Sequence, residues 1–184
     1  MLSGGNVHYE MGSRAEAISC GGIGAFHTLA QRMGLVDEID EHLHLLKVHL
    51  PYHESDHVLN ISYNVLVGGQ RLEDIEYQRQ DVTFLNALDA SRLPDPTTAG
   101  DFTRRFDEAG ISTLMDCINR SRARLWNARG RDLLREEALI DIDGTLAPTT
   151  GWRKQGIGLS YNGVWGYHPL VVSLANTKEI LFLE

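Results

Sequence analysis

The sequence predicts a mixed α+β chain of 184 residues, in which a helical part precedes antiparallel strands. Three observations lead to this prediction. Up to about residue 130, apolar residues recur mainly every three or four positions, as they do on one face of a helix. From Glu136 onward the spacing becomes that of extended chain. No apolar stretch approaches the roughly 20 residues of a membrane span, so no membrane partner is expected.

The chain is expected to divide into three parts. Residues 1–20 are polar and without a pattern, and are predicted to be a flexible leader. Residues 21–130 are predicted to form an all-helical domain, and residues 131–184 begin a domain built of strands. The last predicted strand runs to the final residue, and two strands with no returning helix cannot cover both faces of a sheet. The sequence is therefore expected to be an N-terminal fragment of a longer protein.

The apolar spacing predicts five helices in the first 90 residues. The first is ended by Gly34, the second runs past Leu46 and is ended before Pro51, and the third is a buried helix stopped by Gly68 and Gly69. The apolar positions that define the five helices are Ile23 to Met33, Val36 to Leu46, His57 to Val67, Leu72 to Ile75 and Phe84 to Leu88. Several histidines lie between residues 42 and 57, but their spacing matches no zinc signature, and we expect them on the surface.

Two alternatives describe the start of the next helix. Asp95 can cap it with Pro96 at the first helical position, or Thr98 can cap it with Asp101 three residues later. In either case the helix is predicted to continue through Phe102, Phe106 and Ala109 on its apolar face. A further long helix then runs from Ile111 to about Ala128, and Gly130 closes it.

The charge of this chain is unevenly distributed. The net charge is −8, and nearly all of the acidic excess lies before residue 90. A basic stretch follows on and after the long helix; it comprises Arg120, Arg122, Arg124, Arg129, Arg131 and Arg135. Such a stretch suits contact with a phosphate backbone, but it is equally typical of a solvated helix face, and both interpretations stay open.

Three strands are predicted after the helices. The first spans residues 138–143 and is followed by a long loop over residues 147–162. Residues 168–175 and 179–183 then form a hairpin around a short turn. Asp141 and Asp143 share one face of the first strand, roughly 6 to 7 Å apart, which suits metal-assisted phosphate chemistry. The alternative is an ordinary solvated turn, because Asp and Gly favour turns.

The motif Asp141-x-Asp143-Gly144-Thr145 after an apolar strand closely resembles the opening signature of haloacid dehalogenase-like phosphatases. That resemblance implies Asp141 as the nucleophile and Asp143 as the general acid. Those enzymes usually place the motif near the N-terminus and follow it with a helical turn and a flap. Here more than a hundred residues precede it and an antiparallel hairpin is predicted after it, so this function is kept as the alternative.

A second resemblance covers the chain from about residue 21 to its end. The motifs that carry it are Arg71-Leu72-Glu73-Asp74-Ile75, Thr97 to Phe106, Asp143-Gly144-Thr145, Tyr161-Asn162-Gly163, Gly166 to Leu170 and Asn176 to Leu181. In this order they resemble the DDE transposases of bacterial insertion sequences, most closely the thirteen-eighty family. The resemblance implies that residues 131–184 begin a ribonuclease H-like catalytic domain with its first three antiparallel strands.

The resemblance also implies a chemistry and a set of partners. Asp143 is implied as the first of three catalytic acids and as a ligand of Mg²⁺, for which Mn²⁺ can substitute; Asp141 is the fallback, or an acid that supports the metal ligands. The other two acids would lie beyond Glu184, so the fragment is expected to be inactive alone. The implied reaction is metal-dependent hydrolysis and strand transfer on terminal inverted repeats and target DNA, by a homo-oligomer in the bacterial cytoplasm, associated with the nucleoid.

We expect DNA contacts from the basic residues near these strands and from the helical domain, which is predicted to serve DNA binding or assembly. The residues expected to contact DNA are Arg120, Arg122, Arg124, Arg129, Arg131, Arg153 and Lys154. Tyr161, Trp165 and Tyr167 flank glycines downstream of the acidic strand. They are expected either to stack on an unpaired base or to pack the loop onto the sheet.

Overall fold

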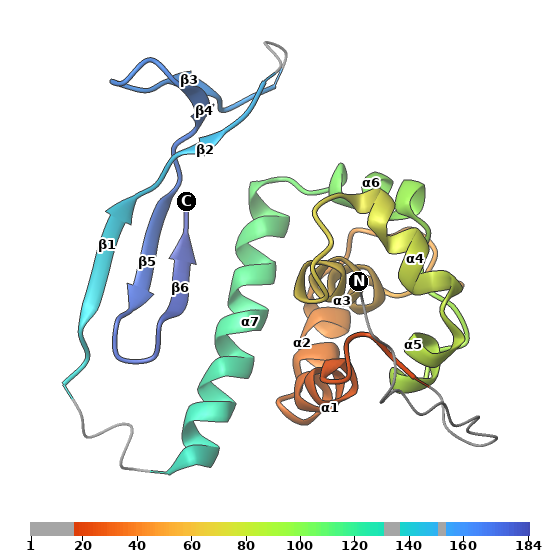
Figure 1. Cartoon of the computed structure of the whole chain (residues 1–184). Helices are drawn as coiled ribbons and strands as arrows, with labels where there is room; N and C mark the ends of the chain where they lie inside the picture. The colour runs from red at the N-terminus through yellow and green to blue at the C-terminus, as the bar shows by residue number, and fades with distance from the viewer. Residues whose placement is uncertain (1–16, 131–136, 151–153) are drawn as a thin grey trace, which may run out of the picture. The chain divides into compact units, whose positions relative to one another are not determined.

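The computed structural model describes residues 17–130, 137–150 and 154–184. The fold is mixed α+β: these ranges contain seven α-helices, a short 3₁₀ helix and two antiparallel sheets of three strands (Figure 1). The predicted fold class is confirmed at this level. Most of the predicted leader, residues 1–16, lies outside the described residues. The chain forms two compact units, Met1–Gly110 and Ile111–Glu184, and each is described by itself.

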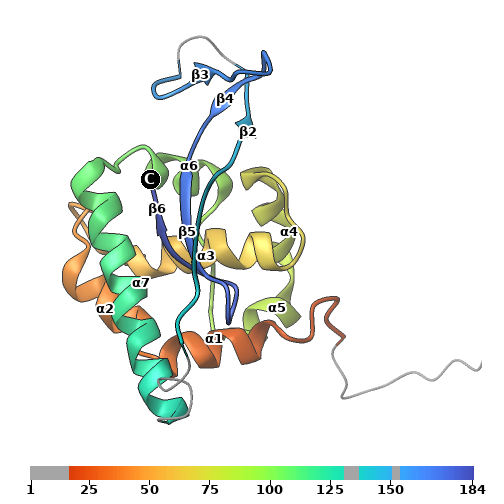
Figure 2. The ribbon, with the colours of Figure 1, turned by 90° about the vertical axis from the view of Figure 1, so that its left-hand side faces the viewer.

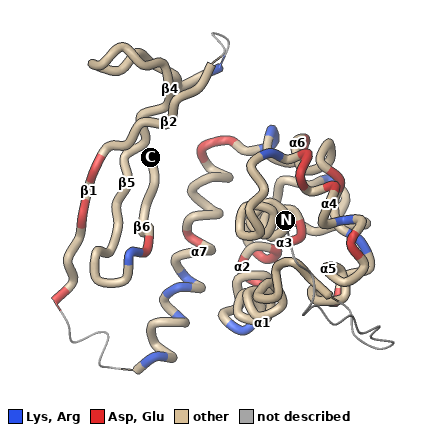
Figure 3. Tube along the Cα trace, in the orientation of Figure 1, with Lys and Arg blue, Asp and Glu red and all other residues tan. Residues whose placement is uncertain are grey.

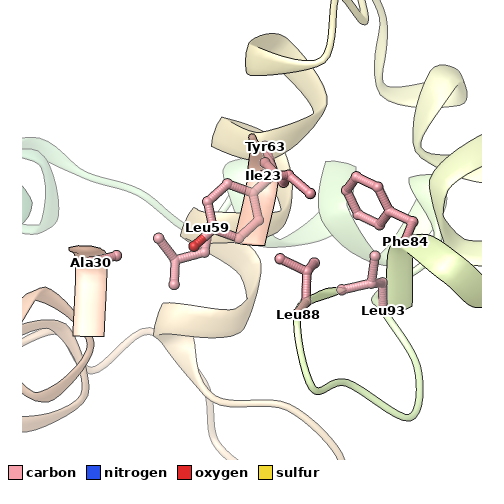
Figure 4. Close-up of a cluster of buried hydrophobic side chains, with 7 residues drawn as sticks. All are labelled: Ile23, Ala30, Leu59, Tyr63, Phe84, Leu88 and Leu93. Atoms are coloured by element: carbon pink, nitrogen blue, oxygen red, sulfur yellow. The ribbon is translucent and has the colours of Figure 1, made fainter. Parts of the chain in front are cut away.

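The first unit is helical. Its elements are α1 (Ile23–Arg32), α2 (Leu35–His42), α3 (Glu54–Leu66), η1 (Leu72–Asp74), α4 (Ile75–Gln80), α5 (Val82–Ala87) and α6 (Pro96–Thr103). Figure 4 shows the core where α1, α3 and α5 meet. The buried cluster comprises Ile23, Ala30, Leu59, Tyr63, Phe84, Leu88 and Leu93. Ile23, Ala30, Leu59, Phe84 and Leu88 are among the apolar positions whose spacing predicted the helices. The agreement is partial, because Val65 and Leu66 of the predicted buried helix are 65% and 54% exposed.

Helix α2 is shorter than predicted, because it ends at His42 and not beyond Leu46. Leu43 is extended, and two amides of the following loop are bound by a side chain instead of a helical carbonyl. The buried carboxylate of Glu54 accepts hydrogen bonds from the backbone N–H of Leu45 at 3.0 Å and of Leu46 at 2.9 Å. Residues 43–46 therefore form a loop that the carboxylate of Glu54 holds in place. Their apolar spacing looks helical, because a sequence period does not show which side chain binds these amides.

The start of α6 decides between the two predicted caps. Asp95 accepts a hydrogen bond from the backbone N–H of Thr98 at 2.9 Å, and Pro96 occupies the first turn. The prediction of one helix through Phe102, Phe106 and Ala109 is wrong. Helix α6 ends at Thr103, and the long helix α7 (Glu108–Arg129) begins after a short break. The rings of Phe102 and Phe106 still pack edge to face, with their centroids 5.4 Å apart. Their four-residue spacing thus reflects a contact across the break and not one continuous helix.

The second unit contains α7 from Ile111 and two sheets. The long sheet comprises β1 (Ile140–Gly144), β5 (Leu170–Leu174) and β6 (Glu179–Leu183), in the order β1-β5-β6 with both pairings antiparallel. The predicted first strand and hairpin are confirmed. A bulge interrupts the β5–β6 register between Val172 and Ser173.

A second sheet, here called the small sheet, includes two short strands from the stretch predicted to be a long loop. It comprises β2 (Ala147–Pro148), β4 (Trp165–Tyr167) and β3 (Gly158–Leu159), in the order β2-β4-β3. The loop prediction for residues 147–162 is therefore wrong in part. The strands are too short to show a periodicity of their own, and they form through pairing with β4, which lies later in the chain. Figures 1 and 2 show the small sheet beyond the C-terminal end of β1.

Among the described helices, none combines the length and hydropathy needed to span a bilayer.

Candidate active site

The two acids of the predicted catalytic motif lie on β1, the edge strand of the long sheet. In the antiparallel register, Asp141 is opposite Ser173 of β5 and Asp143 is opposite Val171. Because side chains alternate along a strand and paired residues share a face, all four lie on one face of the sheet. The two carboxylates are therefore neighbours, two residues apart, as the sequence pattern predicted.

All five positions of the acidic strand β1 are exposed. In the described part of the chain, β1 is an edge strand that pairs with β5 alone. Among the described residues, no group donates a hydrogen bond to the carboxylate of Asp141 or Asp143.

The donor set suits a hard divalent cation. Carboxylate oxygens are the ligands that Mg²⁺ selects, and Mg²⁺ keeps several waters when only one or two carboxylates hold it. Asp143 and Asp141 can supply two such oxygens from one face of β1, where Ser173 lies opposite Asp141 in the register. The residues present therefore fit part of a magnesium site.

The predicted DNA-binding arginines of α7 do not form one patch. A helix turns by about 100° per residue, which places Arg120 and Arg124 on one side and Arg122 and Arg129 on nearly the opposite side. Figure 3 shows the blue basic positions along the C-terminal half of α7. Arg122 donates hydrogen bonds to Asn119 of its own helix and to the backbone carbonyl of Ile180 in β6. Part of its guanidinium is thus used inside the second unit.

The remaining predicted contacts differ in what the structure shows. Arg120 donates to the sulfur of Cys117 at 3.4 Å. Lys154, which is exposed, donates to the hydroxyl of Thr149 beside β2. Arg131 and Arg153 lie outside the described residues. DNA contact by these groups stays a prediction.

This chain was compared with protein-family models, with curated proteins and with solved structures. No protein-family model, curated protein or solved structure matches this chain.

Sequence reasoning left one feature of the site open. Trp165 and Tyr167 lie on β4, and their alternation with Gly166 places both aromatic rings on one face of the small sheet. Tyr161 is 104% exposed, in the turn that joins β3 and β4. The signal in the sequence was the Trp-Gly-Tyr alternation, which is too short to identify a strand until its partners are known.

Proposed function

We propose that this chain belongs to a DNA transposase whose ribonuclease H-like catalytic domain begins at β1, with Asp143 as its first catalytic acid. The single observation that carries the proposal is the position of Asp141 and Asp143. Both project from one face of the first strand of an antiparallel β1-β5-β6 sheet. A first strand that carries the acids, followed by two antiparallel strands, is the succession expected for such a domain.

The same succession supports the transposase over the alternative phosphatase, in which Asp141 is the nucleophile and Asp143 the general acid. The phosphatase interpretation expects a helical turn soon after the motif. In the structure β1 is followed by β2, and no helix occurs in the described residues after Gly144. The transposase is therefore the function that the geometry supports best.

Asp143 would hold the metal ion, Mg²⁺ or Mn²⁺, and Asp141 would either share it or orient its water ligands. When bound, the metal supplies stabilisation of negative charge at the phosphate that is cut or joined. The exposed face of β1 leaves room for a DNA backbone beside both acids. The substrates are the ends of the element and the target DNA, and the protein works as a homo-oligomer at the bacterial nucleoid.

The test is metal-dependent nicking of a duplex that carries the element's end, by the protein translated from the whole reading frame. Asp143→Asn should lower nicking and strand transfer about a hundredfold or more, a loss typical of removing one charge-stabilising group. The affinity for the duplex should not fall by more than about threefold, because the substitution removes a negative charge that repels phosphate.

Asp116→Asn is the matched control, because Asp116 is an exposed acid on helix α7 and not on β1. It should leave nicking unchanged. Metal-dependent nicking that survives in Asp143→Asn contradicts the proposal. Loss of p-nitrophenyl phosphate hydrolysis in Asp141→Asn, with no DNA cleavage by the parent protein, would instead support the phosphatase.

A further inference from the structure

The small sheet has one aromatic face. Trp165 and Tyr167 lie on it two residues apart, and the register places Leu159 of β3 directly opposite Trp165. Trp165 is 56% exposed and Leu159 is 60% exposed. Tyr167, on the central strand, is 38% exposed, and its ring lies beside Gly156. The face thus presents two flat rings and one aliphatic side chain to solvent.

The opposite face explains why the rings are held firmly. It is formed by Gly158, Gly166 and Pro148, which are paired in register across the three strands. Gly166 is buried, and a Cβ at this position would lie 2.5 Å from the carbonyl oxygen of Ala147. No larger residue fits there without moving the backbone of β2. The tight backbone pairing fixes the direction in which Trp165 and Tyr167 project.

The charge around this face points to a polyanion. From Gly144 to Lys178 the sequence contains no Asp or Glu in 35 residues, although the chain carries a net charge of −8. Figure 3 shows acidic positions on β1 and at the start of β6 and none on β2, β3 or β4. Lys154 donates to the hydroxyl of Thr149, whose backbone N–H donates to the carbonyl of Trp165 at 3.1 Å. The positively charged side chain of Lys154 is therefore held next to β4, the strand that carries both aromatic rings.

We infer that the aromatic face of the small sheet binds unpaired nucleotides of DNA, with bases stacked on Trp165 and Tyr167 and a phosphate near Lys154. Aromatic side chains projecting from a sheet are a common platform for single strands, because every base offers a flat π face. A base inside a duplex cannot reach such a face without leaving its stack. This inference rests on the proposed function: if β1 carries the acids that cut DNA, the small sheet that follows β1 would hold an unpaired part of the same DNA substrate.

The size of the face argues against a second copy of the chain as its occupant. Buried aromatic side chains contribute about 150–250 Å² each, and here two half-exposed rings and one leucine add up to roughly 300 Å². A stable dimer needs about 800 Å² from each partner. Two stacked nucleotides, by contrast, match the area and the charge.

The test uses the whole 184-residue chain and a fluorescein-labelled oligothymidylate of about ten nucleotides, a length within the usual site size. Fluorescence anisotropy should show that Trp165→Ala weakens binding about tenfold, whereas Trp165→Phe, which keeps a ring, stays within about threefold. Ile142→Ala is the matched control, because it removes a similarly exposed aliphatic side chain from the long sheet, outside the aromatic face; binding should stay within about threefold. Circular dichroism checks that each variant keeps its fold.

Quenching of tryptophan fluorescence by the oligonucleotide gives a second measurement. It should fall in Trp165→Phe although binding persists, since the stacked indole is gone. The inference is overturned by unchanged affinity in Trp165→Ala, by an equal loss of affinity in Ile142→Ala, or by equal losses of duplex and single-strand binding in Trp165→Ala. It is also overturned if sedimentation shows a dimer that Trp165→Ala dissociates.

These measurements do not involve DNA cleavage. If Asp143→Asn still nicks DNA, the proposed function fails while oligothymidylate binding through Trp165 stands. If Trp165→Ala binds oligothymidylate normally, the inference fails while the nicking result is unaffected.

Discussion

The indole nitrogen of Trp126 donates a hydrogen bond to the carboxylate of Glu179 at 3.0 Å. This bond joins α7 to the start of β6 within the second unit. The same carboxylate oxygen accepts from the hydroxyl of Thr177 at 2.7 Å, in the turn before β6. Arg122, one helical turn earlier, donates to the carbonyl of Ile180. The edge strand β6 is therefore held by side chains of α7 and has part of its hydrogen-bonding edge occupied.

Trp126→Phe should lower the free energy of unfolding of the second unit by about 1.5 kcal/mol. The substitution keeps an aromatic ring but removes the donor to a charged acceptor, a bond worth about 1.5–3 kcal/mol, and Glu179 retains its bond to Thr177. Urea unfolding followed by far-UV circular dichroism measures the change. Tyr161→Phe is the control, because this fully exposed hydroxyl should matter little. Equal stability of Trp126→Phe and the parent chain would show that the bond contributes nothing.

Asp95→Ala should destabilise the first unit by about 1 kcal/mol, the usual effect of losing an N-cap. Asp95 binds both the backbone N–H and the hydroxyl of Thr98, and these hydrogen bonds lower the pKa of the Asp95 carboxyl. The matched control is Asp101→Ala, which breaks only an exposed pair with Arg104 and should cost less than about 0.5 kcal/mol. Thermal unfolding of the two variants compares them. A larger loss in Asp101→Ala would favour Thr98 as the cap.

Glu54→Gln should destabilise the first unit by about 1–3 kcal/mol at neutral pH, because a charged acceptor of two backbone amides is replaced by a neutral one. Burial by itself would raise the pKa of Glu54, but the bonds from Leu46 and Leu45 and the nearby His49 outweigh burial and lower the pKa below 4.5. The stabilisation is therefore present above about pH 4.5 and is lost as the pH falls through the lowered pKa.

The difference in unfolding free energy between Glu54→Gln and the parent chain should accordingly shrink in acid. Urea unfolding at neutral pH and near pH 4 measures it. Glu41→Gln, at an exposed position of α2, is the control and should have little effect at either pH. A difference that is the same at both pH values would contradict the role assigned to the charge.

His57 predicts a second pH dependence, near neutrality. Contrary to the expected surface position, this histidine is buried and stacks on Phe102 with ring centroids 4.5 Å apart. Burial lowers the pKa of His57 below 6.5, although the carboxylates of Asp56 and Glu54 oppose the shift. The unfolded chain then binds the proton more readily, so the first unit should lose stability as the pH falls from about 6.5, by up to ~1.4 kcal/mol per pH unit for one proton.

His57→Phe keeps an aromatic ring in the stack and removes the titrating group, so the loss of stability below pH 6.5 should be smaller. Some dependence should remain, since burial also lowers the pKa of His27. Urea midpoints measured across this pH range test the prediction. His44→Gln, at an exposed position, should leave the slope as in the parent chain. A slope that is unchanged in His57→Phe would rule out the assignment to this residue.

The sequence by itself determined the elements whose signals are local. The helix spacing located α1, α3, α5 and α7, because each of them repeats its apolar positions over several residues on one face. The alternation of residues 140–143 placed Asp141 and Asp143 on one face of a strand, because that geometry depends on the strand alone. The glycine at position 130 ends α7 with a positive φ of 92°, as its place after the periodic stretch predicted.

Only the tertiary structure decided the features that need a partner far along the chain. Glu54 ends the helical path after His42 by binding two amides of the preceding loop. Pairing with β4 turns two dipeptides into strands and brings Trp165 and Leu159 together. The arginines of α7 form one basic run in the sequence, yet the turn of the helix places them on different sides. Arg122 in addition donates a hydrogen bond to the carbonyl of Ile180. These contacts join residues that no sequence period connects, and so the pattern cannot specify them.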